Sequence, residues 1–281
     1  MIEIWKKSEL DRLMRSHGLR CSKAFGQNFL TDKNTLDKIV KAAELAPDDH
    51  VVEIGAGLGA LTVLLAQKAG RVTAIEIDKR LMPALTEATA GLENTDLVNE
   101  DFLKWDRRGT YKVIGNLPYC ATTPIIAKLF EPGIDSIRPT PPALAVLMMQ
   151  KEVAERLVSP PGKKAYGAIS VLVQYYTEAE LLFGVSREVF VPKPGVDSAV
   201  VRLRPKDLTG DDPETAALMF RLVRAGFDMR RKTLRNSLSA TGFPEAKLLA
   251  ALEATGIDPI RRAETLSPRD FYRLASALRA V

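Results

Sequence analysis

Four consecutive residues, Asn116-Leu117-Pro118-Tyr119, have the chemistry needed to act on the exocyclic amine of a nucleobase. Such an amine is a poor nucleophile because its lone pair is delocalised into the ring. Two acceptors aimed at its hydrogens would localise that lone pair. The Asn116 side-chain oxygen and the Leu117 carbonyl, held by the fixed φ of Pro118, can supply them. Tyr119 can stack on the base; a plain Asn-Pro turn is the alternative.

A glycine-rich loop, Gly55-Ala56-Gly57-Leu58-Gly59, lies between an expected strand and an expected helix, where an α/β sheet opens its ligand crevice. Ala60 replaces the last glycine of the Gly-x-Gly-x-x-Gly dinucleotide pattern, which argues against a bound pyrophosphate. Glu76 follows Gly55 by 21 residues and ends the next expected strand, where its carboxylate can accept both hydroxyls of a ribose. Gly55, Gly57 and Glu76 therefore predict a nucleoside ligand; glycines that merely turn the chain are the alternative.

Two further residues fit such a site less specifically. Asp101 follows a third expected strand and can accept a hydrogen bond from an adenine amino group, although Asp at this position is also a common turn or helix cap. Phe190 can stack on the second face of an extruded base, and is otherwise a core residue. Such stacking is worth ~1–3 kcal/mol, which offsets much of the few kcal/mol that unstacking costs.

The net charge of +5 is concentrated at the two ends of the chain. Residues 1–30 hold six cations and three acids, residues 31–204 hold 21 and 22, and residues 205–281 hold 13 and 10. The segment 221–235 contains one acid and six cations, namely Arg221, Arg224, Arg230, Arg231, Lys232 and Arg235. We expect Arg231 and Arg235 to share one helical face. This distribution favours contact with the phosphates of a nucleic acid; a solvated helix face is the alternative.

Strands and helices alternate along the part of the chain that must position these residues. Strands are expected at 50–54, 72–75, 97–98, 113–114 and 143–148. Helices are expected after a cap at Asp32, after the glycine loop and from Lys79. This alternation predicts an α/β fold with a doubly wound parallel sheet.

A second domain is expected after residue 204. A late strand at 199–203 ends at Pro205, and residues 163–167 are expected to form an exposed connection. From Asp212-Pro213, a cap followed by proline at the first helical position, the remainder is predicted to be helical with breaks at Gly226, Gly242 and Gly256. The expected domains are thus 1–204, with the catalytic site, and 205–281, with the cationic segment.

Composition argues against several other classes of protein. Cys21 and Cys120 cannot form a disulfide framework, which favours a reducing, cytoplasmic location. His17 and His50 have no ligand spacing, so we expect no metal site and no His-based hydrolase. The apolar run 143–149 is too short to span a bilayer, and the first residues lack the apolar core of a secretion signal. We therefore expect no membrane partner.

Five ordered motifs resemble those of the KsgA-type ribosomal RNA adenine dimethyltransferases, which use S-adenosylmethionine. They are Phe25–Leu30, Glu53–Thr62, Asn116–Tyr119, Phe190–Ser198 and Arg230–Leu238, and the resemblance covers nearly the whole chain. It implies a Rossmann-like class I methyltransferase domain with a mostly parallel, seven-stranded sheet and a small all-helical C-terminal domain that binds rRNA. The chain departs from the family pattern at Ala56, where proline is common, and at Cys120-Ala121-Thr122, where Asn-Ile-Ser is common.

The resemblance also implies roles for individual residues. S-adenosylmethionine would be bound by Asn28, Leu30, Gly55, Gly57, Glu76, Asp101 and Asn116. The target base would be held by Asn116, Leu117, Pro118, Tyr119 and Phe190. The implied reaction places two methyl groups on N6 of each of two adjacent adenosines near the 3′ end of small-subunit rRNA, in an immature ribosomal subunit. We expect the protein to be monomeric.

Three other functions remain open from the sequence. A related enzyme that modifies large-subunit rRNA and confers macrolide resistance shares the glycine loop and the tetrapeptide type, although the Arg230–Leu238 segment argues against it. A non-catalytic assembly or transcription factor could keep the fold, but this chain retains the full set of expected site residues. A small-molecule methyltransferase would not need the surplus of cations at the two ends.

Overall fold

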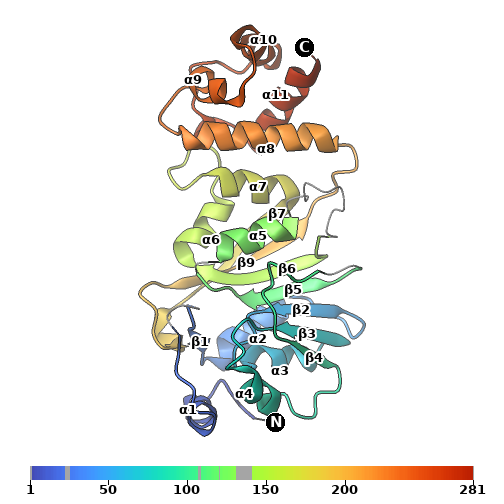
Figure 1. Cartoon of the computed structure of the whole chain (residues 1–281), viewed down its shortest axis with the longest axis vertical. Helices are drawn as coiled ribbons and strands as arrows, with labels where there is room; N and C mark the ends of the chain where they lie inside the picture. Colours follow the sequence, from blue (N-terminus) through green and yellow to red (C-terminus); the bar gives the residue numbers. More distant parts are fainter. Residues whose placement is uncertain (1, 23–25, 107–108, 120, 131–140, 281) are drawn as a thin grey trace. The chain divides into compact units, whose positions relative to one another are not determined.

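The computed structural model describes residues 2–22, 26–106, 109–119, 121–130 and 141–280. Phe25 and Cys120 lie outside these ranges. The chain divides into two compact units (Figure 1). The sheet unit comprises residues 1–154 and 180–205, and the helical unit comprises residues 155–179 and 206–281. The expected boundary near residue 205 coincides with one of these divisions, but residues 155–179 belong to the helical unit and not to the first domain.

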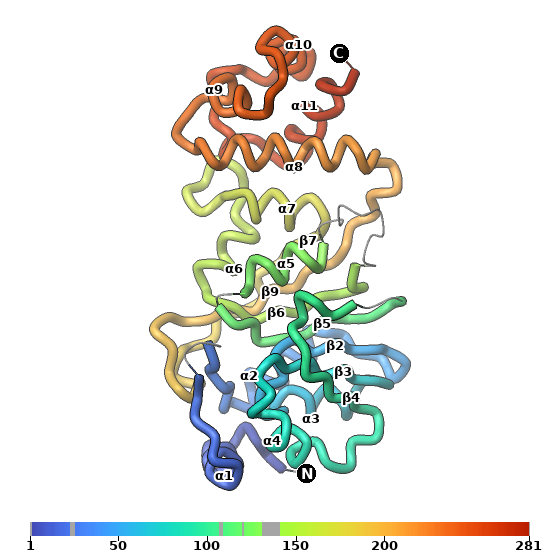
Figure 2. Tube along the Cα trace, viewed as in Figure 1, coloured from blue at the N-terminus to red at the C-terminus, as the bar shows by residue number. Residues whose placement is uncertain are grey.

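A seven-stranded sheet organises the sheet unit, with strand order β4-β3-β2-β5-β6-β9-β7 (Figure 2). The strands are β2 (His50–Ile54), β3 (Arg71–Ile75), β4 (Thr95–Val98), β5 (Lys112–Asn116), β6 (Leu144–Gln150), β7 (Thr177–Val185) and β9 (Ser198–Pro205). The first five strands of this order are parallel, and β9 runs antiparallel to β6. The predicted doubly wound, mostly parallel sheet is confirmed. Its central strands are near-continuous apolar runs, as burial on both faces requires.

Helices connect the strands of this unit. They are α1 (Lys7–Ser16), α2 (Lys33–Ala42), α3 (Ala60–Ala66), α4 (Met82–Ala88) and α5 (Thr122–Phe130), with α6 (Lys151–Val158) crossing into the helical unit. Helix α2 begins as predicted, because the Asp32 carboxylate accepts a hydrogen bond of 2.8 Å from the Thr35 N–H. Helix α4 begins three residues later than expected. Residues 78–81 first form a turn, in which the Leu81 N–H donates to the Asp78 carbonyl at 2.9 Å.

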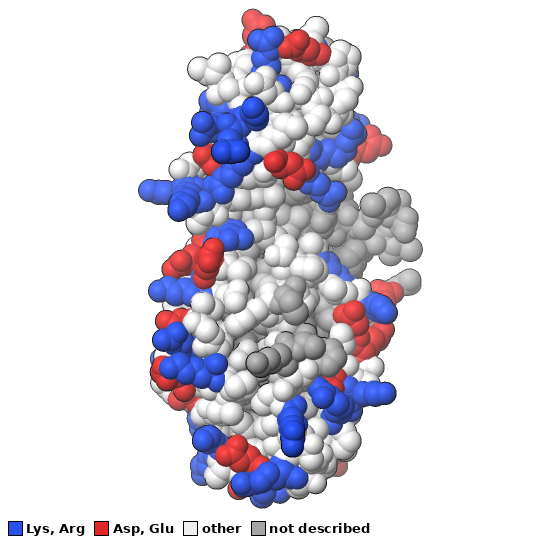
Figure 3. Space-filling model, turned by 60° about the vertical axis from the view of Figure 1, so that its left-hand side comes forward, with Lys and Arg blue, Asp and Glu red and all other residues white. Residues whose placement is uncertain are grey.

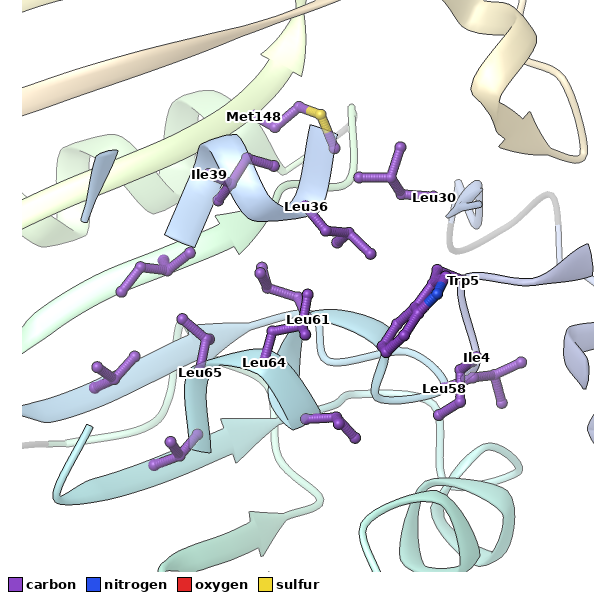
Figure 4. Packing of buried hydrophobic residues seen from close by; sticks show 14 of the residues in the cluster. Ile4, Trp5, Leu30, Leu36, Ile39, Leu58, Leu61, Leu64, Leu65 and Met148 are labelled. Carbon is purple, nitrogen blue, oxygen red and sulfur yellow. The ribbon is translucent and has the colours of Figure 1, made fainter. Parts of the chain in front are cut away.

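The main core lies between these helices and the sheet. Figure 4 shows Leu36 and Ile39 of α2 together with Leu61 of α3 and Met148 of β6. Residues before α1 join the same cluster, which sequence periodicity did not indicate: Ile4 and Trp5 are buried in it. The N-terminal arm is thus part of the sheet unit's core, although its cations among the described residues remain at the surface.

A second, two-stranded sheet joins distant parts of the sheet unit. Strand β1 (Phe29–Leu30) pairs antiparallel with β8 (Phe190–Val191), which follows the short 3₁₀ turn η1 (Arg187–Val189). Leu30 pairs with Phe190, and the Thr31 N–H donates to the Val189 carbonyl at 2.8 Å. Two motifs some 160 residues apart in sequence are thereby fixed side by side.

The helical unit confirms the predicted helical end of the chain. It contains α7 (Ala168–Tyr176), α8 (Pro213–Asp228), α9 (Leu234–Leu238), α10 (Glu245–Thr255) and α11 (Pro268–Ala280), with 3₁₀ turns η2 (Ser239–Thr241) and η3 (Ala263–Thr265). Helix α8 starts at the predicted Asp212 cap. Gly242 and Gly256 end η2 and α10 in the left-handed conformation, at φ 80° and 67°. Gly226, however, lies inside α8, where a Cβ would come within 2.7 Å of the Ala263 Cβ.

Residues 163–165 are exposed as expected, whereas Tyr166 corrects the expectation for the rest of this connection. Tyr166 is fully buried in the helical unit, and its hydroxyl donates to the Leu266 carbonyl at 2.9 Å. Burial of this hydroxyl raises the pKa of Tyr166. The flanking Lys163, Lys164 and glycine suggest solvent exposure, but they carry no information about a long-range partner 100 residues away. The segment is an anchored connection within the unit.

Candidate active site

One cavity in the sheet unit gathers most of the predicted site residues at the carboxyl ends of β2, β3 and β5. Its lining includes Asn28, Leu30, Gly55, Gly57, Glu76, Asn116, Leu117, Pro118 and Tyr119. The carboxyl ends of parallel strands meet at one edge of a sheet, which is where α/β proteins bind ligands. The topology therefore explains why motifs so far apart in sequence share one cavity.

Glu76, directly after β3, is buried in the wall of this cavity. Its Oε2 accepts the Gly57 N–H and its Oε1 accepts the Asp78 N–H, both at 2.8 Å. Burial raises the pKa of Glu76, while these two N–H donors partly oppose that shift. The two carboxylate oxygens together have about four lone-pair sites, more than these backbone donors use. The carboxylate is therefore oriented by the backbone and can still accept two hydroxyls of a ligand.

The glycine loop lies close to two other parts of the site. Gly55 and Gly57 adopt positive φ values of 75° and 59°. A Cβ at Gly55 would lie 3.4 Å from the Asn116 carbonyl oxygen, and one at Gly57 would lie 3.2 Å from the Phe29 ring. Backbone conformation and close approach both require glycine here.

Asn116 ends β5 with its side-chain amide fixed by the backbone. Its Nδ2 donates to the Asn28 carbonyl at 3.1 Å, so Oδ1 is the amide atom left to accept a hydrogen bond from a substrate. The following residue is also fixed, because the Leu117 N–H donates to the Met148 carbonyl at 2.9 Å. The Tyr119 hydroxyl lies 3.2 Å from Ser198 Oγ. The tetrapeptide thus presents acceptors from a backbone anchored to the neighbouring strand.

Acidic side chains, and no lysine or arginine, occur among the described residues that line this cavity. Glu53 is 2% exposed and accepts the Thr62 hydroxyl at 2.5 Å. Burial raises the pKa of Glu53 to about 8, the nearby Glu76 carboxylate adds to the shift, and the Thr62 bond opposes it. Such a lining suits a ligand with ribose hydroxyls, and it offers no lysine or arginine to a phosphate group. S-adenosylmethionine fits this donor and acceptor set.

Comparison with known proteins decides between the families that share such a site. The model of the family described as ribosomal RNA adenine dimethylase matches residues 18–280. This chain belongs to that family. A protein of Pelotomaculum thermopropionicum named ribosomal RNA small subunit methyltransferase A is 44% identical over 99% of this chain and 98% of the relative. A protein of the same name from Moorella thermoacetica is 46% identical over 95% of each chain.

Two solved structures resemble this chain over most of its length. A dimethyladenosine transferase from Plasmodium falciparum has a TM-score of 0.76 and 30% identity, covering 88% of this chain and 95% of the other. The 23S rRNA methyltransferase ErmE has a TM-score of 0.70 and 29% identity, covering 90% and 100%. Both resemblances support the Rossmann-like methyltransferase fold.

The structure adds a residue that sequence reasoning missed. Ile77 follows Glu76, lines the cavity and is 47% exposed, an unusual exposure for a large aliphatic side chain. It offers an apolar surface to a planar ring bound beside the carboxylate. The signal was present in the sequence as an isoleucine between two acidic residues at the end of a strand. Its exposure could not be read from that pattern.

Two predicted residues of this adenine dimethylase are not brought to the cavity. Phe190 is 3% exposed and belongs to the hydrophobic core, where β8 holds it against Leu30 of β1. Its ring is therefore not presented to a base in this structure, and the core alternative describes it. Asp101 Oδ1 accepts the Leu103 N–H at 2.9 Å, which is the turn-capping alternative, and Asp101 does not line the cavity.

The six predicted RNA-binding cations lie in the helical unit, and four of them take part in intramolecular interactions. Arg230 pairs with Glu264 at 2.5 Å and Arg235 with Glu245 at 2.6 Å. Arg221 donates to the Thr241 carbonyl at 3.4 Å. Arg224 is exposed and also takes part in an intramolecular interaction.

Arg231 and Lys232 differ from these four cations, because both are exposed and neither has an ion-pair partner among the described residues. Figure 3 shows Lys and Arg side chains grouped on the visible face of the helical unit, at the top of the view. The expectation that Arg231 and Arg235 share a helical face is wrong. Helix α8 ends at Asp228 and α9 begins at Leu234, so Arg231 lies in the turn between them.

Two kinds of feature are not found among the residues that the structure describes, namely a metal-binding cluster and a membrane-spanning helix. No group of three or more His, Cys, Asp or Glu side chains there is arranged to hold a metal ion. Among the same residues, no helix is both long and apolar enough to cross a bilayer.

Proposed function

We propose that this chain transfers methyl groups from S-adenosylmethionine to N6 of two adjacent adenosines near the 3′ end of small-subunit rRNA, two on each, during assembly of the subunit. The observation that carries the proposal is the fixed amide of Asn116. Its nitrogen is bonded to the Asn28 carbonyl, and the residue lines the same cavity as the ribose-binding candidate Glu76. An amine acceptor and a nucleoside site therefore meet in one cavity.

The cavity residues account for binding of the cofactor. Glu76 would accept the ribose hydroxyls, Ile77 would pack on the adenine ring, and the backbone at Gly55 and Gly57 would allow close approach. Asn28 and Leu30 would cover the ligand from the N-terminal side. When bound, S-adenosylmethionine supplies a methyl group made electrophilic by its sulfonium charge.

The tetrapeptide accounts for activation of the target amine. Asn116 Oδ1 and the Leu117 carbonyl accept its two hydrogens and localise the nitrogen lone pair, while Tyr119 stacks on the base. The amine becomes acidic only after alkylation, so its proton can leave to water and no neutral-pKa side chain is needed as a base. Holding the amine in line with the methyl group is the main contribution of these residues.

The helical unit would contribute phosphate contacts. Arg231 and Lys232 are exposed without ion-pair partners among the described residues, whereas Arg230 and Arg235 would have to exchange Glu264 and Glu245 for phosphates. Arg221 and Arg224 remain proposed contacts of the same surface. We also propose that the protein is monomeric, is cytoplasmic and acts on an immature small subunit.

No particular observation favours the alternative functions. The relatives at 44% and 46% identity are named for the small subunit, while the 23S rRNA methyltransferase ErmE is 29% identical. A non-catalytic factor would have no use for an oriented Asn116 amide beside a nucleoside cavity.

Substitution of Asn116 by alanine tests the proposal. We expect Asn116→Ala to reduce methyl transfer to immature small subunits at least ~100-fold, because both the acceptor and its orientation are lost. Cofactor affinity, measured by calorimetry, should stay within a few-fold of wild type because Glu76 and the glycine loop are untouched. If Asn116→Ala turns over at close to the wild-type rate, the proposed function is contradicted.

A further inference from the structure

A short segment of the N-terminal arm, residues 26–30, contacts both halves of the candidate site. We call it the strap. Two of its neighbouring residues bond in different directions: Gln27 bonds to the turn after β3, and Asn28 bonds to the end of β5. We propose that Gln27 is a positioning residue. It holds the strap so that the Glu76 carboxylate, on the cofactor side, and the Asn116 amide keep their relative orientation. The inference rests on the proposed function, because it assigns Gln27 a role toward the cofactor and Asn116.

On the cofactor side, the Gln27 side chain uses both ends of its amide. Its Nε2 donates to Asp78 Oδ2 at 2.8 Å, and its Oε1 accepts the Ser22 N–H at 2.7 Å. Asp78 is buried, and its own N–H donates to Glu76 Oε1. Hydrogen bonds from Arg80 and Gln27 lower the pKa of Asp78 to about 2, against the effect of burial. Gln27 therefore donates to the Asp78 carboxylate, and the backbone N–H of the same Asp78 donates to the Glu76 carboxylate.

On the catalytic side, the next residue fixes the Asn116 amide through its carbonyl oxygen. The strap is held further along as well. The Phe29 ring lies against Gly57, and Phe29–Leu30 pair with β8. The position of the Asn28 carbonyl is therefore set by Gln27 on one side and by β1 on the other.

Glutamine is the residue type that this place requires. The side chain must accept a backbone N–H and also donate to a carboxylate, which an amide does in one fixed orientation. A bond to an ionised, buried partner is among the stronger hydrogen bonds of a protein. Loss of it should loosen the strap at both ends. Gln27 should therefore affect cofactor affinity and turnover together, although it is not expected to touch the reacting atoms.

The isosteric variant Gln27→Glu tests the hydrogen bond separately from packing. A residue that only fills space would not make cofactor affinity depend on pH. The neighbouring Asp78 anion raises the pKa of the introduced carboxyl. Below that pKa the carboxyl is neutral and can donate as the amide does, whereas above it the two carboxylates repel. We expect the dissociation constant for S-adenosylmethionine, as a ratio to wild type at the same pH, to be near one at pH 5 and to rise about tenfold or more by pH 8.

Two further variants complete the test. Gln27→Ala should weaken cofactor binding about tenfold and lower kcat at every pH, while melting as cooperatively as wild type. Arg80→Ala removes another partner of Asp78 without touching the strap, and it should leave kcat within about twofold. A pH-independent ratio for Gln27→Glu, or wild-type affinity and kcat for Gln27→Ala, would overturn the inference. Wild-type turnover by Asn116→Ala would overturn the proposed function instead. The two outcomes can be told apart, because the ratio of dissociation constants for Gln27→Glu is measured by cofactor binding and needs no turnover.

Discussion

Asn116 carries one amide nitrogen and one amide oxygen, and a single backbone carbonyl decides which of them can serve a substrate. The sequence predicts the residue type, because an Asn before Leu-Pro at the end of a strand is suited to accept from an amine. It does not predict the partner, because Asn28 lies 88 residues away. The same limit applies to Gln27 and Asp78, which are 51 residues apart.

Phe190 shows the opposite limit. An aromatic residue next to a proline-rich segment can face a ligand or the core, and local pattern does not separate these two places. The pairing of Leu30 with Phe190 decides for the core in this structure. Asp101 accepts a local hydrogen bond from Leu103, and its predicted contact with an adenine amino group stays a prediction. Residue chemistry could thus be predicted at most positions of the site, whereas side-chain direction could not.

Glu53 should make stability depend on pH. Its pKa is raised to about 8 by burial, from an ordinary value of 4.5. Between these values the folded state binds more protons than the unfolded state, so stability falls as pH rises through this window and is level above it. We expect Glu53→Gln, measured by denaturant unfolding without cofactor, to be more stable than wild type at pH 8.5 by about 1 kcal/mol or more. The difference should vanish by pH 4. Parallel stability curves for the two proteins would contradict this account.

At the scale of elements, apolar runs, caps and the glycine loop were sufficient to predict the parallel strands and the starts of α2, α3 and α8. Strands β2, β3, β5 and β6 lie where short, mainly apolar runs are flanked by turns, and β4 begins two residues before the predicted pair 97–98. The pair β1 and β8 was not predicted, because two residues in each strand give no periodicity and their pairing is long-range. The burial of Tyr166 within the exposed connection 163–167 was missed for the same reason, since it depends on Leu266.

Gly226 gives a prediction about one helix. Alanine in a helix interior ordinarily gains about 1 kcal/mol over glycine, but here its Cβ would lie 2.7 Å from the buried Ala263 Cβ. Overpacking of this kind costs about 1–3 kcal/mol, so we expect Gly226→Ala to lower the melting temperature. The double variant Gly226→Ala with Ala263→Gly should recover part of the loss. If Gly226→Ala is as stable as wild type, the prediction is wrong, because η3 at Ala263 then moves at little cost.

At the scale of the whole molecule, the division into two units explains the distribution of charge better than the net value does. The cavity of the candidate site lies wholly in the sheet unit, and its described lining contains no lysine or arginine. Cations gather in the helical unit, but ion pairs already engage Arg230 and Arg235. A count of basic residues in the sequence therefore overstates the charge that is free for a polyanion.

The salt dependence of RNA binding tests this view. If Arg231 and Lys232 contact phosphates, reversing both charges with Arg231→Glu and Lys232→Glu should make the slope of log K against log salt shallower by about 1.5. The charge-conserving pair Arg231→Lys and Lys232→Arg serves as the matched control and should keep the wild-type slope. Cofactor affinity should not change in either variant. An unchanged slope after charge reversal would show that Arg231 and Lys232 do not contact phosphates and are only solvated surface residues.

The most direct measurement is mass spectrometry of rRNA nucleosides after incubation with S-adenosylmethionine and three substrates: unmodified immature small subunits, large subunits and naked rRNA. We expect N6,N6-dimethyladenosine to accumulate in small-subunit rRNA, at two adjacent positions near its 3′ end, and not in large subunits. The Asn116→Ala protein should give none. Dimethyladenosine in large-subunit rRNA alone, or no methylated adenosine in any substrate, would contradict the account.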